Sequence, residues 1–328
     1  MMSQRHAQLQ QWAQQTEQNS DLTLELISGD ASFRKYYRAA NRIWVDAPPA
    51  TEKNREFIAN SAALLNAGIT APLVLQYDME NGFLCVSDLG DRSLLSCLSD
   101  SSVTAWYTKA LQLLPQLTQV QLDLPVFDAE FMERENAIFP EWLLEKHLQL
   151  ELSAEEKTLL AETFALLTEN NLQQPQVVMH RDFHSRNLMV SEDDSLAVID
   201  FQDMVLGPLT YDAVSLLKDC YCRWPDPVIA QGAEYAWQLY VDTGVLSAGT
   251  SLPQFMQWLD LTGMQRHLKA AGIFARLHHR DGKSGYLKDI PRTLSYVSDV
   301  AAQYPQLAAF SGWLQQRVLP AFTMDALA

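Results

Sequence analysis

The sequence predicts an α+β protein in which a small antiparallel sheet is followed by a larger, mostly helical region. Within residues 1–89, short segments of alternating polarity are separated by turn residues, and one turn is Asn81-Gly82, a strong hairpin signal. Beyond Gly90 the apolar residues recur mostly at helical spacing. We therefore expect two lobes, residues 1–89 with a linker at their end and residues 90–328, and a ligand cleft between the lobes.

The elements expected in the first lobe begin with an amphipathic helix. In chain order they are a helix over 3–19, strands over 22–27, 33–39 and 42–46, a helix over 54–67, and a hairpin over 73–77 and 82–86. Gly68 is the expected stop of the second helix. Residues 87–91 leave the sheet and form the expected linker.

The second lobe is expected to be helical on both sides of one short hairpin. Its expected helices are 94–98, 104–119, 128–148, 153–170, 210–222, 228–243 and 252–277, with two more near the C-terminus. The helix at residue 153 opens with Ser153-Ala154-Glu155-Glu156, a capping box.

Composition limits the class of protein and its partners. Of the 328 residues, 48% are hydrophobic, which indicates an ordered protein with a sizeable core. The formal net charge of −16 argues against nucleic acid and anionic membranes as partners. No stretch resembles a signal peptide or approaches the roughly 18 apolar residues of a membrane span, so we expect a cytoplasmic protein. The four Cys match no zinc spacing and are expected to be free thiols.

One stretch, residues 177–203, carries the functional prediction. An apolar run delivers His180 and Asp182 into a polar loop that ends at Asn187, and strands over 188–190 and 196–199 then return the chain to Asp200. Phosphoryl transfer from ATP needs a carboxylate at the acceptor hydroxyl, and an amide oxygen and a second carboxylate to hold Mg²⁺. The order H-x-D-x-x-x-x-N, followed by Asp after a strand, therefore predicts a kinase active site. A single Asp or Asn after a strand is usually a turn former, but five polar residues in this order fit that alternative poorly.

The motifs resemble those of the aminoglycoside phosphotransferase/choline kinase superfamily, small-molecule kinases with the protein-kinase-like fold. Within it the chain looks most like the bacterial anomeric kinases for N-acetylmuramate and N-acetylglucosamine of cell-wall (peptidoglycan) recycling. The matching segments are SGDASFRKYYR (28–38), VDAPP (45–49), MHRDFHSRNLMV (179–190), IDFQDMVLGPLTYDAVSLLKDCY (199–221) and QRHLKAAGIFARLHHRDGKSGYLKDIPR (265–292). They span nearly the whole chain.

The resemblance implies a role for each residue of the central motif. Asp182 would orient or deprotonate the sugar hydroxyl, and Asn187 and Asp200 would coordinate Mg²⁺. Asp203 would assist a second metal ion or bind substrate. The expected structural residues are His180 and Arg181, which shape the loop, and Asp212, which braces its backbone.

The nucleotide site departs from the protein-kinase pattern. Its turn contains one glycine and consists of Ser28, Gly29, Asp30, Ala31 and Ser32. The strand over 42–46 has no lysine where protein kinases place the phosphate-binding one. Arg34 is our choice for the missing cation, with Lys35 and Arg38 as alternatives and Glu56 as its orienting partner. The linker backbone at Ser87, Asp88 and Leu89 would hydrogen-bond adenine.

For the sugar the sequence offers candidates only. They are Glu135 and Trp142 on one helix, and a basic cluster of Arg266, His267 and Lys269, which would suit a lactyl carboxylate. The polar face of a helix is the simpler interpretation of this cluster, and loop stabilisation is the simpler interpretation of His184, which could otherwise contact substrate.

These observations predict an ATP-dependent kinase acting on the anomeric (C1) hydroxyl of N-acetylmuramate and N-acetylglucosamine. A kinase for another small alcohol, such as an aminoglycoside, choline or a fructosamine, is a second possibility. A nucleotide-binding regulatory pseudokinase is a third, which the missing strand lysine favours and the intact Asp182, Asn187 and Asp200 oppose. The preferred sugar, ATP against GTP, and the oligomeric state stay open.

Overall fold

The computed structural model describes residues 4–28 and 33–325, and the chain forms two compact units. Unit 1 contains Met1–Cys97, Gln119–Asp123 and Arg186–Met204. Unit 2 contains Leu98–Thr118, Leu124–Ser185 and Val205–Ala328.

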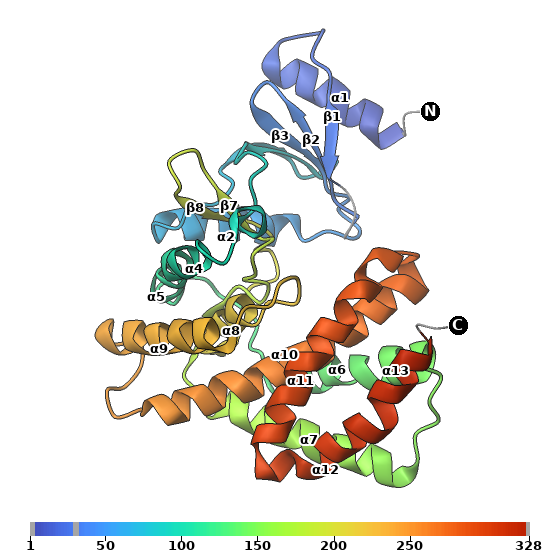
Figure 1. The fold of residues 1–328 in the computed structure, drawn as a ribbon. Coiled ribbons are helices and arrows are strands. Elements are labelled where there is room, and N and C mark those ends of the chain that lie inside the picture. Colours follow the sequence, from blue (N-terminus) through green and yellow to red (C-terminus); the bar gives the residue numbers. More distant parts are fainter. Residues whose placement is uncertain (1–3, 29–32, 326–328) are drawn as a thin grey trace. The chain divides into compact units, whose positions relative to one another are not determined.

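Unit 1 is built on a five-stranded antiparallel sheet with the strand order β1-β2-β3-β5-β4 (Figure 1). Its strands are β1 (Glu25–Ser28), β2 (Lys35–Ala39), β3 (Arg42–Asp46), β4 (Val74–Asp78) and β5 (Phe83–Ser87). Helix α1 (Gln4–Glu17) packs on the sheet, where Trp12 meets Trp44 edge to face at 5.3 Å. Each strand is close to its predicted position, and the predicted antiparallel sheet is confirmed.

Two glycines of unit 1, Gly68 and Gly82, occupy positions with positive φ that other residues adopt less readily. Helix α2 (Asn54–Asn66) is followed by Gly68 at φ +80°, the left-handed conformation that glycine adopts most readily. At Gly82, between β4 and β5, φ is +70° and a Cβ would lie 2.1 Å from the Ala47 carbonyl oxygen. Only glycine fits this hairpin turn.

A second hairpin joins unit 1 from far along the chain. It consists of β7 (Leu188–Val190) and β8 (Leu196–Val198), and single bridges tie it to Ser93 and Thr70. Helix α3 (Leu94–Cys97) packs on β7. The sequence places one boundary between residues 89 and 90, whereas these bridges join residues 186–204 to the first unit.

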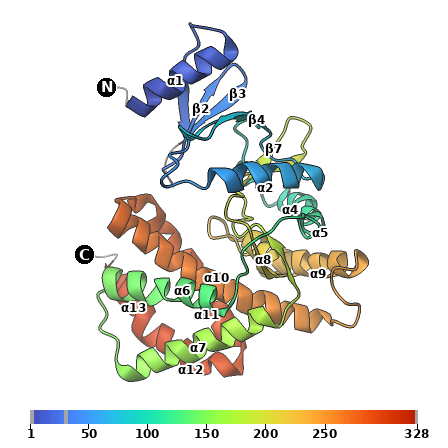
Figure 2. The same cartoon turned by 180° about the vertical axis from the view of Figure 1, so that it is seen from behind.

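Unit 2 is mostly helical, and α10 (Leu252–Asp281) is its central element (Figures 1 and 2). Helices α7 (Ala154–Leu172), α8 (Tyr211–Leu217) and α11 (Ile290–Gln303) pack against it. Its other helical segments are α4 (Val103–Leu111), α5 (Leu113–Leu117), α6 (Ala129–Asn136), η1 (Phe139–His147), α9 (Asp226–Asp242), η2 (Ser284–Asp289), η3 (Pro305–Leu307), α12 (Ala308–Trp313), η4 (Leu314–Val318) and α13 (Leu319–Asp325). The capping box at the start of α7 is present, with Ser153 and Glu156 bonded to each other's backbone N–H groups.

Several helices of unit 2 differ from their predicted extents. The helix expected over 104–119 is divided into α4 and α5, and that over 128–148 into α6 and the π-helix η1. Each second half contains a proline, Pro115 or Pro140, which lacks the N–H that continues a helical ladder. Strand β9 (Val205–Pro208) was not predicted; it pairs antiparallel with β6 (Gln176–Met179).

None of the helices in the described residues is long and apolar enough to span a membrane.

Candidate active site

In unit 2 the central motif forms a short loop, residues 180–185, which we call the Asp182 loop. Strand β6 leads into it, and pairing of Met179 with Val205 on β9 fixes the last strand residue before it. Met179 is buried beside Phe127, Met132 and Tyr211. The apolar run therefore anchors the loop, and the polar residues follow directly after it.

Asp212 holds the backbone at the start of this loop. Its carboxylate accepts hydrogen bonds from the N–H groups of His180 at 2.6 Å and Arg181 at 3.0 Å. Burial raises the pKa of Asp212 to about 6, although His180 and the two N–H donors act in the opposite direction. Arg181 has φ +75°, a conformation that costs roughly 1–3 kcal/mol for a residue with a side chain. The bonds to Asp212 offset that cost and match the bracing role predicted for it.

Asp182 lies within a group of cationic side chains. Its own N–H donates to Nδ1 of the buried His180 at 3.3 Å. Burial by itself would raise the pKa of the Asp182 carboxyl, but nearby basic groups outweigh it and hold the pKa well below its usual range. In decreasing order of influence these groups are Lys269, His184, Arg266 and Arg181. The carboxylate is consequently ionised at neutral pH.

Glu135 links two of these cations. It is buried on α6, and its Oε1 lies 2.6 Å from the guanidinium of Arg181 and 3.3 Å from Nζ of Lys269. Burial would raise the pKa of Glu135, but Lys269 and Arg181 lower it below its usual value. The other carboxylate oxygen, Oε2, is buried without a hydrogen bond. Glu135 thus keeps one acceptor atom available.

Asp219 fixes the far end of the Asp182 loop. It is fully buried after α8 and accepts hydrogen bonds from the Ser185 N–H at 3.0 Å and from the Ser185 hydroxyl. It also accepts the N–H of Tyr221 at 2.8 Å. Buried carboxylates therefore hold both ends of the loop, which limits the positions that Asp182 can take.

The predicted metal ligands Asn187 and Asp200 lie together in unit 1. They stand at the open end of the β7–β8 hairpin, where the Ile199 N–H donates to the Asn187 carbonyl at 3.0 Å. The Asn187 side-chain amide is 3.3 Å from Oδ2 of Asp200, and Gln202 donates to Oδ1 at 2.8 Å. Asp200 is exposed and has φ +64°, a conformation that Asp tolerates better than most residues.

The segment after Asp200 is anchored to α2. Asn60 donates to the Phe201 carbonyl at 2.8 Å, and the Phe201 ring packs on Phe57 at 4.9 Å. Asp203 pairs with Lys53 at 2.6 Å; the Lys53 side chain is exposed and that of Asp203 is partly exposed. The buried Phe201 fixes the position of Asp200, whereas the exposed ion pair contributes at most about 1 kcal/mol.

This hairpin offers a donor set that suits Mg²⁺. No group of three or more His, Cys, Asp or Glu able to hold a metal occurs in residues 4–28 and 33–325. An amide oxygen and a carboxylate are hard ligands, and Mg²⁺ commonly binds one or two carboxylates together with water and substrate phosphates. The pair Asn187 and Asp200 fits that requirement.

Arg34, the predicted phosphate-binding cation, is buried before β2. It lies 3.4 Å from Glu52 and over the ring of Phe57 at 4.9 Å. The predicted partner Glu56 is wrong: its side chain is exposed, while Glu52 precedes α2 on the side that faces Arg34. Burial raises the pKa of Glu52, although Arg34 lowers it.

The two alternative cations differ in their surroundings. Lys35 is exposed, whereas Arg38 bonds to Asp88 at 2.6 and 2.9 Å and to Asp91 at 2.9 Å. Arg38 therefore ties β2 to the linker. Its use as the phosphate cation would require it to leave these carboxylates. The phosphate-loop residues Gly29, Asp30, Ala31 and Ser32, and the side chain of Ser28, lie outside the described residues.

Comparison with known proteins identifies the family. Residues 23–248 match the phosphotransferase enzyme family. A Pseudomonas aeruginosa protein named N-acetylmuramate/N-acetylglucosamine kinase is 40% identical over 292 residues, which cover 87% of this chain and 86% of that protein. A Neisseria meningitidis serogroup B protein of the same name is 35% identical over 326 residues, 96% of both chains. This chain belongs to the phosphotransferase enzyme family.

Solved structures of low sequence identity share the fold of this phosphotransferase. An ethanolamine kinase from Plasmodium vivax has a TM-score of 0.67 at 12% identity and covers 93% of this chain and 89% of its own. The choline kinase LicA from Streptococcus pneumoniae has a TM-score of 0.65 at 13% identity, with 92% and 100% covered. An ADP-bound aminoglycoside phosphotransferase has a TM-score of 0.61 at 14% identity, with 90% and 98% covered. The predicted kinase-like fold is confirmed.

The sugar-binding candidates of this phosphotransferase have different surroundings. Arg266 and Lys269 on α10 lower the pKa of Asp182, and Glu135 forms an ion pair with Lys269. His267 is wrong as a substrate contact, because it points into the core, where Nε2 lies 2.7 Å from the Lys218 carbonyl and the ring stacks on Tyr296. Trp142 lies in η1 under the ammonium of Lys146 at 3.8 Å.

Two partners of the predicted residues were not predicted: Glu52, which pairs with Arg34, and Asp219, which binds the end of the Asp182 loop. Neither left a signal in the sequence, because both depend on contacts between segments that are separated along the chain.

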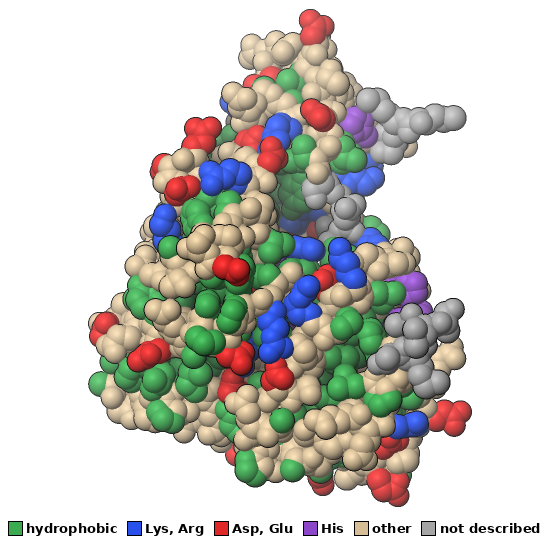
Figure 3. All heavy atoms as spheres, viewed as in Figure 1, with side chains coloured by type: hydrophobic (Ala, Val, Ile, Leu, Met, Phe, Trp, Pro, Cys, Tyr) green, Lys and Arg blue, Asp and Glu red, His purple; other side chains and the backbone are tan. Residues whose placement is uncertain are grey.

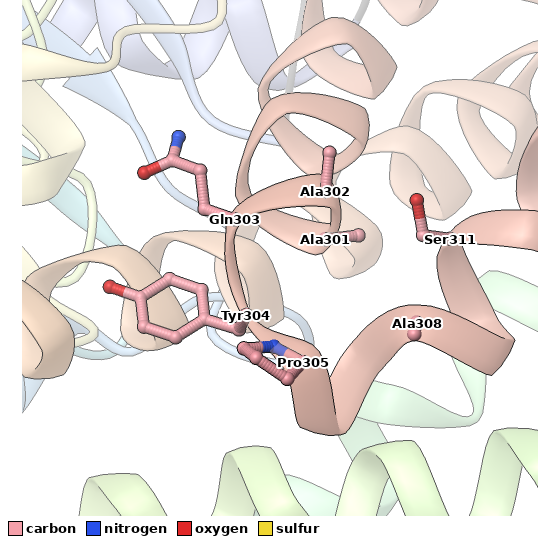
Figure 4. A pocket seen from close by; sticks show the side chains of 7 residues that line it. All are labelled: Ala301, Ala302, Gln303, Tyr304, Pro305, Ala308 and Ser311. Atoms are coloured by element: carbon pink, nitrogen blue, oxygen red, sulfur yellow. The ribbon is translucent and has the colours of Figure 1, made fainter.

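Unit 2 also has a pocket away from this chemistry. It holds about 290 Å³ at the turn between α11 and α12, beside Ala301, Gln303, Tyr304 and Ser311 (Figure 4). Its lining includes no charged side chain, and the Tyr304 hydroxyl already donates to Asp260 at 2.8 Å. We assign it no part in phosphoryl transfer.

Proposed function

We propose that this phosphotransferase transfers the γ-phosphoryl group of ATP to the anomeric hydroxyl of N-acetylmuramate and N-acetylglucosamine, as part of peptidoglycan recycling. The substrate class is supported by relatives of that name at 35–40% identity over most of the chain. The predicted choice of C1 follows from the sequence resemblance.

The observation that carries the catalytic part is the setting of Asp182. Its loop is held by Asp212 and Asp219, and cationic neighbours keep its carboxylate ionised. The phosphoryl transition state is loose, so a fixed carboxylate that orients the hydroxyl contributes more than a strong base would. Asp182 is the group that orients the sugar hydroxyl and accepts its proton as the oxygen–phosphorus bond forms.

Four residues separate Asp182 from Asn187 in the chain, so the acceptor carboxylate and the first metal ligand follow one another closely. Asn187 and Asp200 would hold Mg²⁺, which would supply positive charge to the phosphates during transfer. Arg34 supplies the cation that the strand lysine provides in protein kinases. Adenine bonds to the linker backbone at Ser87, Asp88 and Leu89, and residues 28–32 form the phosphate loop.

The test is an ADP-release assay with N-acetylmuramate, N-acetylglucosamine, glucosamine, choline and an aminoglycoside. Phosphorus NMR of the product distinguishes C1 from C6, because an anomeric phosphate couples to the C1 proton and is labile to acid. We expect turnover of the two N-acetyl sugars and an anomeric product. Choline as the best substrate, or a 6-phosphate, would contradict the assignment, and absence of any turnover would favour a regulatory pseudokinase.

Asp200→Ala tests the proposed metal site in the same assay. Loss of one of two protein ligands should raise the Mg²⁺ concentration needed for half-maximal rate and weaken Mg²⁺–ATP binding in titration. Glu192→Ala, at an exposed position in the turn of the same β7–β8 hairpin, serves as the matched control. Unchanged Mg²⁺ dependence in Asp200→Ala would exclude this residue as a ligand.

A further inference from the structure

Four cations lie on one face of α10. Arg266, Lys269, Arg276 and Arg280 occur at intervals of three, seven and four residues, which places them along one side of an α-helix. Figure 3 shows Lys and Arg side chains gathered over the α10 and α11 part of unit 2, although the chain as a whole carries a net charge of −16. The four α10 cations are a local concentration of positive charge in an acidic chain, and two of them, Arg266 and Lys269, are buried.

Three of the four cations have a clear partner or neighbour within unit 2. Lys269 pairs with Glu135 at 3.3 Å and Arg280 with Asp281 at 2.8 Å. Arg266 is buried, bonds to Sγ of Cys220 at 3.4 Å, and contributes to the low pKa of Asp182. Lys269 and Arg280 are thus compensated by ion pairs, and Arg266 has the carboxylates of Asp182 and Asp219 near it.

Arg276 differs from them. Its Nε is buried without a hydrogen bond, and no ion pair of its guanidinium occurs in residues 4–28 and 33–325. Asp281, Glu141 and Glu135 raise its pKa only from beyond ion-pair distance. Burial, followed by the like charge of Arg280, lowers the pKa of Arg276. A partly buried guanidinium without a counter-ion costs free energy, because its hydration is lost and nothing replaces it.

Arg276 lies on the same face of α10 as Lys269, the cation with the largest influence on Asp182. Lys269 lies seven residues earlier, roughly 10 Å along the helix axis. Between them Gly272 packs directly on the start of η1, where a Cβ would lie 2.5 Å from the Ile138 carbonyl oxygen. This close contact fixes α10 against η1, and a π-helical segment often marks a functional site.

We propose that Arg276 binds the carboxylate of an acidic sugar substrate and so determines the preference of this enzyme for N-acetylmuramate over N-acetylglucosamine. The proposal rests on the function proposed above. The two sugars differ by the lactyl ether on C3, whose carboxylate is the only charge either carries. A guanidinium binds a carboxylate through two parallel N–H donors, which an ammonium cannot reproduce. Arg276, which has no ion pair, would then bind the carboxylate of the substrate. Lys269, which is paired with Glu135, would keep Asp182 ionised.

The test compares kinetics on the two sugars. Arg276→Met should lower kcat/KM for N-acetylmuramate by about 10- to 100-fold, mainly through KM, as expected for loss of a hydrogen-bonded charge. The fall for N-acetylglucosamine should be much smaller, and its turnover also reports that the variant is folded. Arg276→Lys should restore part of the loss, because it returns the charge but not the two-donor geometry. Arg280→Met, one turn on and already paired with Asp281, is the matched control and should affect both sugars alike.

Other outcomes would overturn the proposal. Equal losses for both sugars in Arg276→Met, or no loss for either, would remove Arg276 from carboxylate recognition. A raised KM for ATP with unchanged sugar KM would instead assign Arg276 to the nucleotide phosphates. If the wild-type enzyme phosphorylated N-acetylglucosamine but not N-acetylmuramate, the proposal would fail while the sugar-kinase function stood. If it phosphorylated neither, the proposed function would fail first, and this proposal with it.

Discussion

The carboxylate of Asp182 lies among basic side chains from the Asp182 loop and α10, and their charge decides its protonation state. Asp182→Asn keeps the shape of the side chain and removes the charge. We expect kcat to fall by about 10²- to 10⁴-fold, the usual contribution of a positioned proton acceptor. Nucleotide affinity, measured by titration with ATP and Mg²⁺, should stay close to wild type, because Asn187 and Asp200 are unchanged. Near-normal turnover would remove Asp182 from the chemistry.

Among the nearby basic groups, Lys269 lowers the pKa of Asp182 the most. Lys269→Met removes that charge, while Glu135 keeps its pair with Arg181 at 2.6 Å. A carboxylate that loses a neighbouring cation protonates at higher pH, so the acidic limb of the kcat/KM profile should move to higher pH. Lys157→Met makes the same substitution at an exposed position of α7 and should leave the profile in place. An acidic limb that does not move in Lys269→Met would mean that Lys269 does not set the state of Asp182.

At the scale of single elements, local signals in the sequence were reliable where they fix the backbone by themselves. The Asn81-Gly82 turn, the stop at Gly68 and the capping box at Ser153 all occur as predicted. Strand β9 gave no such signal, since it contains Gly207 and Pro208, and only its pairing with β6 makes it a strand. Elements that depend on a distant partner could not be predicted from their own residues.

Gly272 tests how closely α10 must approach η1. In Gly272→Ala the new Cβ would lie 2.5 Å from the Ile138 carbonyl oxygen and 2.9 Å from the Phe139 nitrogen. These are backbone atoms that cannot rotate away, so the helices must separate. We expect the free energy of unfolding to fall by about 1–3 kcal/mol, measured by denaturant titration, and the sugar KM to rise.

Gly312→Ala is the control for this substitution. Gly312 lies in α12, and a Cβ there would meet nothing within 4 Å. Alanine is the better helix former, so this variant should be unchanged or slightly more stable. If Gly272→Ala behaved like Gly312→Ala, the close contact between α10 and η1 would have no energetic consequence.

At the scale of the whole molecule, the order of the motif along the chain predicted candidate site residues, but not their hydrogen-bond and ion-pair partners. Asp182, Asn187 and Asp200 could be chosen as candidates from the sequence because a loop between two strands needs only local connectivity. It gave Arg34 the wrong partner, Glu56 in place of Glu52, since that contact depends on how the chain enters α2. His267 was grouped with Arg266 by proximity in sequence, although adjacent helical positions face different directions. Side-chain direction, rather than sequence distance, separates the buried histidine from the cations near Asp182.

The buried His267 couples the stability of the fold to pH. Burial, followed by the charge of Arg266, lowers the pKa of His267 to about 3, below the value of about 6.5 in an unfolded chain. Between these values the unfolded state binds a proton that the folded state does not. The contribution of neutral His267 is therefore fully present above pH 6.5 and is lost as the pH falls toward 3. In this range the free energy of unfolding falls by about 1.4 kcal/mol for each pH unit.

His267→Gln isolates this effect. The difference in free energy of unfolding between the wild type and the variant, measured by denaturant titration, should fall with that slope as the pH is lowered from 6.5. Asp212 acts oppositely, because its pKa is raised to about 6 and protonation favours the fold, but it is common to both proteins and cancels in the difference. His279→Gln, at an exposed position, provides the comparison. A stability difference that stays constant with pH would show that His267 is protonated as readily in the folded protein as in the unfolded chain.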